Sequence, residues 1–303
     1  MSGQISTYLG IEIGGSKLQI VEGDASARIV RRWRAGADRE RGAEGIQQQL
    51  EQALRSEFAG GAVAGVGVGF GGPVNHASGR IAVSHQVGGW NDFPLRDWLG
   101  DVIGAPVVVE NDSNVAALGE AFADPDSSPL FYFNVGSGVG GGLVIARRIY
   151  RGQPPGECEF GHVRLDRGGA TVESRCSGWA VDARIRERRS AGGVLAKLTA
   201  GMHGGEAKVL AEALRQGDAV AGEILRELAD DLGFALSHVV HLFHPQVVVM
   251  GGGLSMVGEP LRAAAEAALG RYVMKAFLPA PAIRLARLGE DSVPVGALRL
   301  AMA

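Results

Sequence analysis

The sequence predicts an α/β protein with two lobes, because of its size, its buried strands and its clustered glycines. The chain has 303 residues, 46% of them hydrophobic, which is enough to bury a sizeable core in each of two lobes. Short apolar runs typical of buried strands are followed by glycine turns or by helical patterns. The 47 glycines are about twice the usual share of roughly 7%, and their clusters mark turns.

Composition argues against several classes of partner. The formal net charge is −3, and no dense basic patch would draw the chain to nucleic acid or to an anionic membrane. Two cysteines, Cys158 and Cys176, give neither a disulfide framework nor a C-x-x-C pair. The first residues lack a signal core, and no run of eighteen apolar residues occurs. We expect a soluble cytoplasmic protein.

The first elements form a glycine hairpin and a helix. Leu9, Ile11 and Ile13 alternate as in a strand, Gly14–Lys17 interrupts them, and a second strand follows. This is no P-loop, because G-x-x-x-x-G-K-[ST] is not met and no helix follows. Residues 44–58 carry an apolar residue at every fourth position, which indicates an amphipathic helix.

A valine–glycine strand comes next, at Val63–Phe70. The string Gly67-x-Gly69-x-x-Gly72 matches the dinucleotide fingerprint, but Pro73 and a loop follow where a helix should begin. We therefore expect these glycines to let a ligand approach the backbone closely.

Residues 107–120, V-V-V-E-N-D-S-N-V-A-A-L-G-E, read as a buried strand, a polar turn and a helix over Val115–Phe122. The turn places Asp112 at the carboxyl end of a buried strand, where open α/β sheets bind ligands. The alternative is that Asp112 or Ser113 merely caps the helix.

A polar segment, residues 124–129, is the best candidate for a crossing between lobes. A strand over Leu130–Val135, a glycine loop over Gly136–Gly142 and a strand over Leu143–Ile145 follow, which makes a second glycine hairpin. The backbone N–H groups of such tips can bind anions. Two tips of this kind could hold a polyphosphate from both sides.

The remaining elements end in a third glycine cluster. We expect helices over Ser177–Ser190, Glu206–Leu214, Asp218–His241, Glu259–Leu269 and Val293–Met302, and strands over Gln246–Met250 and Ile283–Leu285. The Gln246–Met250 strand runs into Gly251–Gly253 and then a helix, an arrangement that lets a nucleotide pack on the turn.

Five segments, in this order, resemble motifs of the ROK sugar kinases, within the actin-like ATP-binding superfamily. They are G-I-E-I-G-G-S-K, E-N-D-S-N-V-A-A-L-G-E, G-S-G-V-G-G-G, E-F-G-H and V-V-V-M-G-G-G. The resemblance implies a two-lobed actin-like (RNase H-like) ATPase fold with an interlobe cleft. The lobes would be residues 1–123 with the C-terminal helix 290–303, and residues 124–289.

Carried over residue by residue, the resemblance implies a sugar kinase in which Asp112 takes the proton of a sugar hydroxyl, by analogy the 6-OH. That hydroxyl then attacks the γ-phosphate of ATP. The residues expected to hold the sugar are Gly72, Pro73, Asn111, Glu159, His162 and Glu173. Those expected to hold ATP are Gly14, Gly15, Ser16, Lys17, Gly136, Ser137, Gly138, Gly251, Gly252 and Gly253. Relatives often form homodimers, which we expect here too.

Two positions depart from the family pattern. Glu12 replaces the usual aspartate that holds Mg²⁺ through water. Most relatives follow E-x-G-H with a cysteine-rich zinc loop, whereas here a short segment without cysteine leads from His162 to Glu173. We therefore expect ATP and Mg²⁺ as cofactors and no zinc.

Other readings of the same motifs stay open. Some ROK proteins are sugar-responsive repressors, but the first phosphate motif begins about ten residues into this sequence, and a basic footprint is lacking. A non-catalytic sugar-binding or regulatory protein without a DNA-binding domain is the alternative to an enzyme. Polyphosphate is the alternative to ATP as donor, because glycine tips would hold either.

Overall fold

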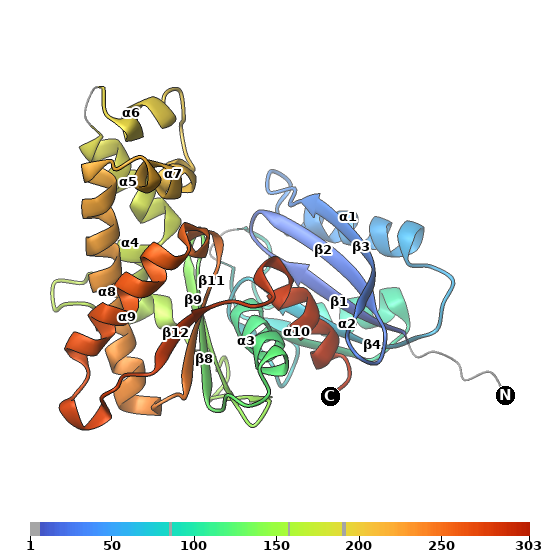
Figure 1. Ribbon diagram of the computed structural model, residues 1–303. Coiled ribbons are helices and arrows are strands. Elements are labelled where there is room, and N and C mark those ends of the chain that lie inside the picture. Colours follow the sequence, from blue (N-terminus) through green and yellow to red (C-terminus); the bar gives the residue numbers. More distant parts are fainter. Residues whose placement is uncertain (1–6, 85–86, 157, 190–191) are drawn as a thin grey trace. The chain divides into compact units, whose positions relative to one another are not determined.

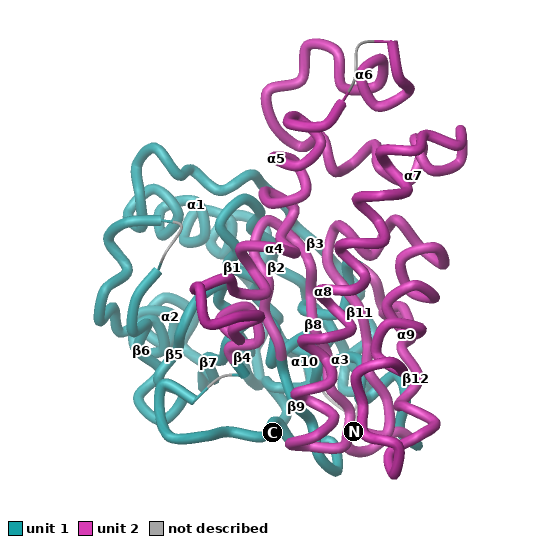
Figure 2. Tube along the Cα trace, turned by 90° about the vertical axis from the view of Figure 1, so that its left-hand side faces the viewer, with its two compact units in different colours: residues 1–126, 142–158, 290–303 teal, residues 127–141, 159–289 magenta. Residues whose placement is uncertain are grey.

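The computed structural model in Figure 1 describes residues 7–84, 87–156, 158–189 and 192–303. Strands and helices alternate along the chain, which confirms the predicted α/β class. The chain divides into two compact units, coloured separately in Figure 2. Unit 1 comprises residues 1–126, 142–158 and 290–303, and unit 2 comprises residues 127–141 and 159–289.

Unit 1 is built on a five-stranded sheet with strand order β3-β2-β1-β4-β7. Its strands are β1 (Thr7–Ile13), β2 (Lys17–Gly23), β3 (Ile29–Gly36), β4 (Val63–Phe70) and β7 (Val107–Asn111). β1, β4 and β7 run parallel, whereas β2 pairs antiparallel with both β1 and β3. The carboxyl ends of β1, β4 and β7 therefore share one edge, where such sheets bind ligands.

One face of this sheet is covered by α1 (Gly42–Glu57) and α2 (Leu95–Ile103), which bury the alternate apolar residues of the strands. The apolar stripe predicted for residues 44–58 is confirmed, since Ile46, Leu50 and Leu54 are all buried. Trp90 is also buried, and its ring meets those of Phe70 and Phe93 edge-on at 5.2 Å. β5 (Val74–Asn75) and β6 (Arg80–Ile81) add a small ribbon.

The other face is covered by α3 (Asp112–Ala123) and α10 (Ser292–Leu300), which lie side by side. Glycines make this close approach possible. A Cβ on Gly67 would lie 1.9 Å from the carbonyl oxygen of Ala297, and one on Gly69 would lie 2.8 Å from Val293. The expectation that these two glycines admit a ligand is wrong, because a packed helix occupies the space.

The second sheet has strand order β10-β9-β8-β11-β12. Its strands are β8 (Leu130–Val135), β9 (Val139–Ile145), β10 (Arg148–Ile149), β11 (Val247–Gly251) and β12 (Ala282–Leu285). β8, β11 and β12 run parallel, so this sheet repeats the plan of the first, with a hairpin on one side and parallel strands on the other. Its residues 142–149 belong to unit 1 and the rest to unit 2.

The helices of unit 2 are α4 (Val172–Cys176), α5 (Gly178–Arg188), α6 (Val194–Leu198), α7 (Leu210–Arg215), α8 (Ala219–Phe243) and α9 (Glu259–Tyr272). Short 3₁₀ turns occur at η1 (Phe160–His162), η2 (Glu206–Val209), η3 (Gly253–Val257) and η4 (Lys275–Phe277), with η5 (Gly289–Asp291) leading into α10. The long helices α8 and α9 pack together, and a Cβ on Gly233 would lie 2.4 Å from that of Ala268.

Several predicted boundaries were wrong. The glycine loop expected over 136–142 ends at Gly138, because β9 begins at Val139. The helix expected over 206–214 starts as a 3₁₀ turn, and α4 and β3 were not predicted. Within the described part of the chain, no helix is both long and apolar enough to span a membrane.

Candidate active site

The turn between β7 and α3 is organised by Asn111, which caps the helix. Its side-chain oxygen accepts hydrogen bonds from the backbone N–H groups of Ser113 (2.9 Å) and Asn114 (3.3 Å). The helix thus begins at Asp112, earlier than predicted, and neither Asp112 nor Ser113 is its cap. An N-cap satisfies helix-end N–H groups that would otherwise lack a partner. Asp112 is therefore not needed for that task.

The amide nitrogen of Asn111 also has a partner within unit 1. It donates a hydrogen bond to the carbonyl oxygen of Gly72 at 3.2 Å, which ties the end of β7 to the loop after β4. Asn111 is buried, and a primary amide has two N–H donors, so one remains for a ligand. Gly72 turns sharply, its own N–H donating to the carbonyl oxygen of Phe70 at 2.9 Å.

Asp112 lies beside the first glycine tip. A Cβ built on Gly71 would be 3.4 Å from the Asp112 carboxylate oxygen Oδ2 and 3.6 Å from the Cα of Gly14. The Gly71 N–H donates to the carbonyl oxygen of Ile13 at 2.9 Å, which fixes this loop against the end of β1. Within unit 1, the Asp112 carboxylate and the start of the tip thus lie near the same face of Gly71.

The first tip, Gly14–Lys17, leaves two backbone donors available. The Gly14 N–H donates to the Lys17 carbonyl oxygen at 3.0 Å. The next two N–H groups, those of Gly15 and Ser16, have no acceptor among the described residues. Adjacent N–H groups of this kind form an anion-binding nest.

Glu12, at the end of β1, is engaged inside the same hairpin. Lys17 Nζ lies 3.0 Å from one carboxylate oxygen and Gln19 Nε2 lies 2.5 Å from the other. Gln19 is fully buried and pairs with Glu12 across the strands. Glu12 also pairs in register with Gly69, whose Cβ position is 3.4 Å from the Asp112 Cα. A carboxylate near a phosphate tip suits Mg²⁺, which takes one or two carboxylates plus phosphate oxygens.

The second tip, Gly136–Gly138, is held differently. The Gly136 N–H closes the turn onto the Gly138 carbonyl oxygen at 2.9 Å. The N–H groups of Ser137 and Gly138 have no acceptor in the described part of the chain, so this tip too has an anion nest. The Gly178 N–H, at the start of α5, donates to the Gly136 carbonyl oxygen at 2.7 Å.

Two segments of unit 2, those carrying Glu173 and Gly161, contact Val139, the residue that follows this tip. The Glu173 carboxylate oxygen Oε2 accepts the Val139 N–H at 2.9 Å. Gly161, in the middle of E-F-G-H, packs on the same residue, since a Cβ there would lie 2.3 Å from the Val139 carbonyl oxygen. The same Cβ position is 3.5 Å from the Glu173 Cβ. The predicted sugar motif and the second phosphate tip therefore form one packed cluster.

The other two predicted sugar ligands of unit 2 lie at the surface. The side chain of Glu159 is 46% exposed and that of His162 is 65% exposed. They form a loose pair, with 3.9 Å between His162 Nε2 and the Glu159 carboxylate. Both have polar atoms available for a ligand.

The segment between His162 and Glu173 is closed by hydrogen bonds. The Val172 N–H donates to Val163 and the Leu165 N–H to Ala170, at 3.0 and 2.8 Å. Thr171 then caps α4 through a capping box with Ser174, which sets the first turn of the helix that carries Glu173.

This segment does not fit a zinc ion. It carries no cysteine, and the described residues hold no group of three or more His, Cys, Asp and Glu placed to bind a metal. Burial, together with the negative charge of Asp231, raises the pKa of the Cys176 thiol far above its ordinary value, whereas zinc binds thiolate.

The third glycine cluster follows β11. Gly251 is buried, and a Cβ there would lie 2.2 Å from the Tyr132 hydroxyl, so this glycine serves packing. Gly252 has φ +81° and faces the backbone of Val135, whereas nothing lies within 4 Å of a Cβ on Gly253. Because β8 and β11 are neighbours, this turn and the second tip follow adjacent strand ends.

Comparison with known proteins supplies the family. The family model described as ROK family matches residues 8–303. The chain belongs to the ROK family. The structure resembles that of a ROK family glucokinase from Streptomyces griseus in complex with glucose and AMPPNP, at TM-score 0.86 and 31% identity over 98% of this chain and 99% of that one.

Two further relatives match over nearly their whole lengths. A ROK hexokinase from Thermus thermophilus has a TM-score of 0.79 and 30% identity, over 98% of each chain. A glucokinase from Halalkalibacterium halodurans is 28% identical, over 95% of this chain and 93% of the relative. The actin-like ATPase fold expected from the motifs is confirmed by these matches.

Sequence reasoning missed two groups that support the site of this ROK protein. Glu110 is fully buried just before Asn111, and Arg151 Nε lies 2.7 Å from its carboxylate. Its other carboxylate oxygen accepts from the amide of Asn114 at 3.4 Å. Removing one partner of a buried pair leaves an uncompensated charge. Glu110 stood in the predicted polar turn, but nothing in the sequence pointed to Arg151.

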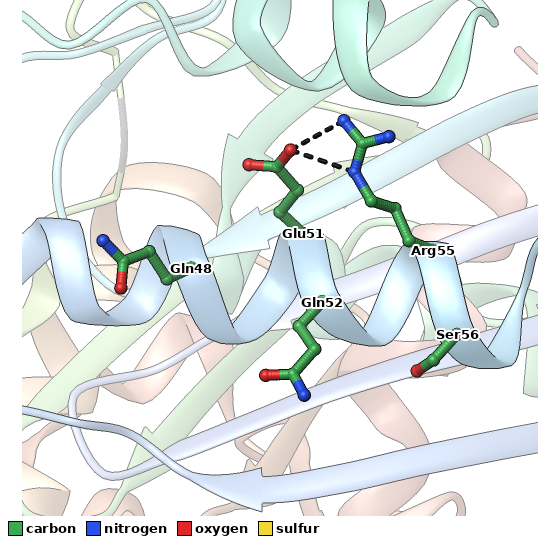
Figure 3. Close-up of a pocket in the computed structure, with 5 residues that line it drawn as sticks. All are labelled: Gln48, Glu51, Gln52, Arg55 and Ser56. Carbon is green, nitrogen blue, oxygen red and sulfur yellow. Dashed lines mark hydrogen bonds and ion pairs between the residues drawn. The ribbon is translucent and has the colours of Figure 1, made fainter.

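The exposed face of α1 also carries a shallow depression of about 490 Å³, shown in Figure 3. It is lined by Gln48, Glu51, Gln52, Arg55 and Ser56. Glu51 and Arg55 pair at 2.7 Å, and all five residues come from one helix. A ligand in this depression would contact one helix only, whereas ligand sites are normally concave and enclosed, so we interpret the depression as the solvated face of α1.

Proposed function

We propose that this ROK family protein is a sugar kinase that transfers the γ-phosphoryl group of ATP to a hydroxyl of a hexose or an N-acetylhexosamine, with Asp112 as general base. One observation carries the proposal: the Asp112 carboxylate and Gly14 of the first phosphate tip lie 3.4 and 3.6 Å from the same point, the position of a Cβ on Gly71. The similar glucokinase that binds glucose and AMPPNP supports it, since AMPPNP has the adenosine and triphosphate framework of ATP.

In the reaction, Asp112 accepts the proton of the sugar hydroxyl as its oxygen attacks the γ-phosphorus. The new sugar O–P bond forms while the bond between the γ-phosphorus and the bridging oxygen breaks, and ADP leaves with that electron pair. Asn111 rather than Asp112 caps α3, so the proposed role of Asp112 does not compete with helix capping. A positioned base of this kind typically contributes about 10²–10⁴-fold.

The phosphates would be held by backbone N–H groups of the two tips. Gly15 and Ser16 offer one pair, and Ser137 and Gly138 offer the other. Lys17 would add a positive charge, shared with Glu12. Glu12 would hold Mg²⁺ through water, and the bound ion would neutralise charge on the β- and γ-phosphates.

The sugar hydroxyls would be bound by groups that can form two hydrogen bonds each. In unit 1 these are the remaining N–H of Asn111 and the backbone at Gly72 and Pro73. In unit 2 they are Glu159, His162 and the second carboxylate oxygen of Glu173. The 6-OH is proposed as the acceptor by analogy with glucokinases.

The test is ADP release by the purified protein with Mg-ATP and a panel of hexoses and N-acetylhexosamines. We expect turnover on at least one sugar and its loss in Asp112→Asn. Ser113→Ala is the comparison variant, because Ser113 donates to Asp112 Oδ1 at 3.2 Å and is not the cap. A parallel arm with polyphosphate tests the donor. Sugar binding without turnover on any donor would instead support a non-catalytic regulator.

A further inference from the structure

The carboxylate of Glu173 is oriented by the second phosphate tip. Its Oε2 accepts the Val139 N–H at 2.9 Å, and a Cβ on Gly138 would lie 2.6 Å from the same oxygen. The following N–H, that of Gly140, goes to the side-chain oxygen of Asn134 at 3.1 Å. The first two donors of β9 are thus taken by side chains, and the tip depends on them for its position.

The helix that carries Glu173 is itself held by hydrogen bonds at its N-terminus. The capping box of Thr171 sets the start of α4, and the Val172 N–H is bonded to Val163. Gly161 of the sugar motif contacts both Val139 and Glu173 without space for a side chain. The predicted sugar motif E-F-G-H and the predicted phosphate tip therefore both contact Glu173.

We infer that Glu173 is a positioning residue for the phosphoryl donor as well as a sugar ligand. One oxygen fixes the tip through Val139, and the other is available to a sugar hydroxyl. This rests on the proposed function, which places the donor phosphates at the tip. Glu173 thus affects the affinity for the phosphoryl donor even when no sugar is bound.

Charge and hydrogen bonding act in opposite directions at this position. Removing the negative charge of Glu173 favours the triphosphate, whereas losing the acceptor releases the tip. Glu173→Gln removes only the charge, because an amide oxygen can still accept the Val139 N–H. Glu173→Ala removes both. The difference between the two variants isolates the positioning effect.

The experiment is calorimetric titration of AMPPNP with Mg²⁺, without sugar, into the wild-type protein and the variants. We expect Glu173→Gln to bind AMPPNP at least as tightly as wild type, and Glu173→Ala to bind about tenfold more weakly than Glu173→Gln, as for the loss of one hydrogen bond. Glu223→Ala is the control. It removes an exposed carboxylate of α8 outside the proposed site, so donor affinity should stay within about twofold.

Gly138→Ala provides an independent variant, because its methyl group would displace Oε2. Combined with Glu173→Ala, it should cause no further loss of donor affinity, since the two changes break one contact. Equal AMPPNP affinity in Glu173→Ala and Glu173→Gln would overturn the inference while leaving the kinase proposal intact. Failure of wild type to bind AMPPNP would overturn both.

Discussion

The two glycine tips each present two adjacent N–H groups, but the contacts that support them differ. The first is stabilised within its own hairpin, where Lys17 and Gln19 of β2 both contact Glu12 of β1. The second is stabilised from outside, by Glu173, 34 residues from its partner Val139, and by the start of α5. A change at the first tip should therefore act on the donor alone, and a change at the second on both substrates.

Gly161→Ala should have the largest effect of the variants proposed, because it should displace the second tip. Its methyl group would lie 2.3 Å from a backbone oxygen, and backbone cannot move aside as a flexible side chain can. Overpacking of this kind costs about 1–3 kcal/mol. We expect a lower melting temperature and more than tenfold weaker binding of both glucose and AMPPNP, by calorimetry.

Gly222→Ala is the matched control for that substitution. Gly222 lies in α8, and nothing lies within 4 Å of a Cβ there. The change should raise stability by up to about 1 kcal/mol, as alanine does in helices, and leave both affinities unaltered. Wild-type affinities in Gly161→Ala would show that the cluster does not position the tip.

Lys17→Ala should affect the first tip alone. The ion pair with Glu12 is partly exposed, so its loss should change the free energy of unfolding by no more than about 1 kcal/mol. Loss of the proposed contact between Lys17 and phosphate should weaken AMPPNP binding about tenfold, whereas glucose affinity stays constant. Lys275→Ala, at an exposed lysine of η4, is the control. An equal loss of glucose affinity would remove the distinction between the tips.

Thr171→Ala should give the smallest effect. It deletes the capping box of α4, which contributes about 1 kcal/mol, and so loosens the helix that carries Glu173. We expect glucose and AMPPNP affinities to fall about two- to fivefold, a few times less than the loss of Glu173 itself. Thr171→Ser keeps the capping hydroxyl and should restore both. A larger loss than in Glu173→Ala would mean that Thr171 acts elsewhere.

The same contrast explains what the sequence could predict. The first hairpin was predicted correctly because alternation and the G-G-S-K turn are local signals, and β1 and β2 confirm it. The second hairpin was placed correctly, but its loop was predicted to end at Gly142, whereas β9 already begins at Val139. Gly142 lies inside β9, and its absent side chain makes room for α3, since a Cβ there would lie 2.7 Å from the Ser113 carbonyl oxygen. A glycine required by tertiary packing looks like a turn glycine in the sequence.

Other errors have equally specific causes. β3, I-V-R-R-W-R-A-G, is half-exposed at a sheet edge, and its arginines hide the strand pattern. From the sequence, Asn111 is expected to hold the sugar alone, although asparagine is also among the most favoured N-cap residues and Asn111 caps α3. The contacts of Glu173 with Val139 and of Arg151 with Glu110 depend on folding and leave no local pattern.

The central claim is that Asp112 performs the proton transfer while the tips only hold phosphate, and Asp112→Asn tests it most directly. The substitution preserves shape and the acceptor for Ser113, so calorimetric affinities for glucose and AMPPNP should stay within about threefold. Single-turnover transfer from Mg-ATP to the sugar that the wild type uses should fall by about 10²–10⁴-fold. Transfer at the wild-type rate with both ligands bound would contradict the account.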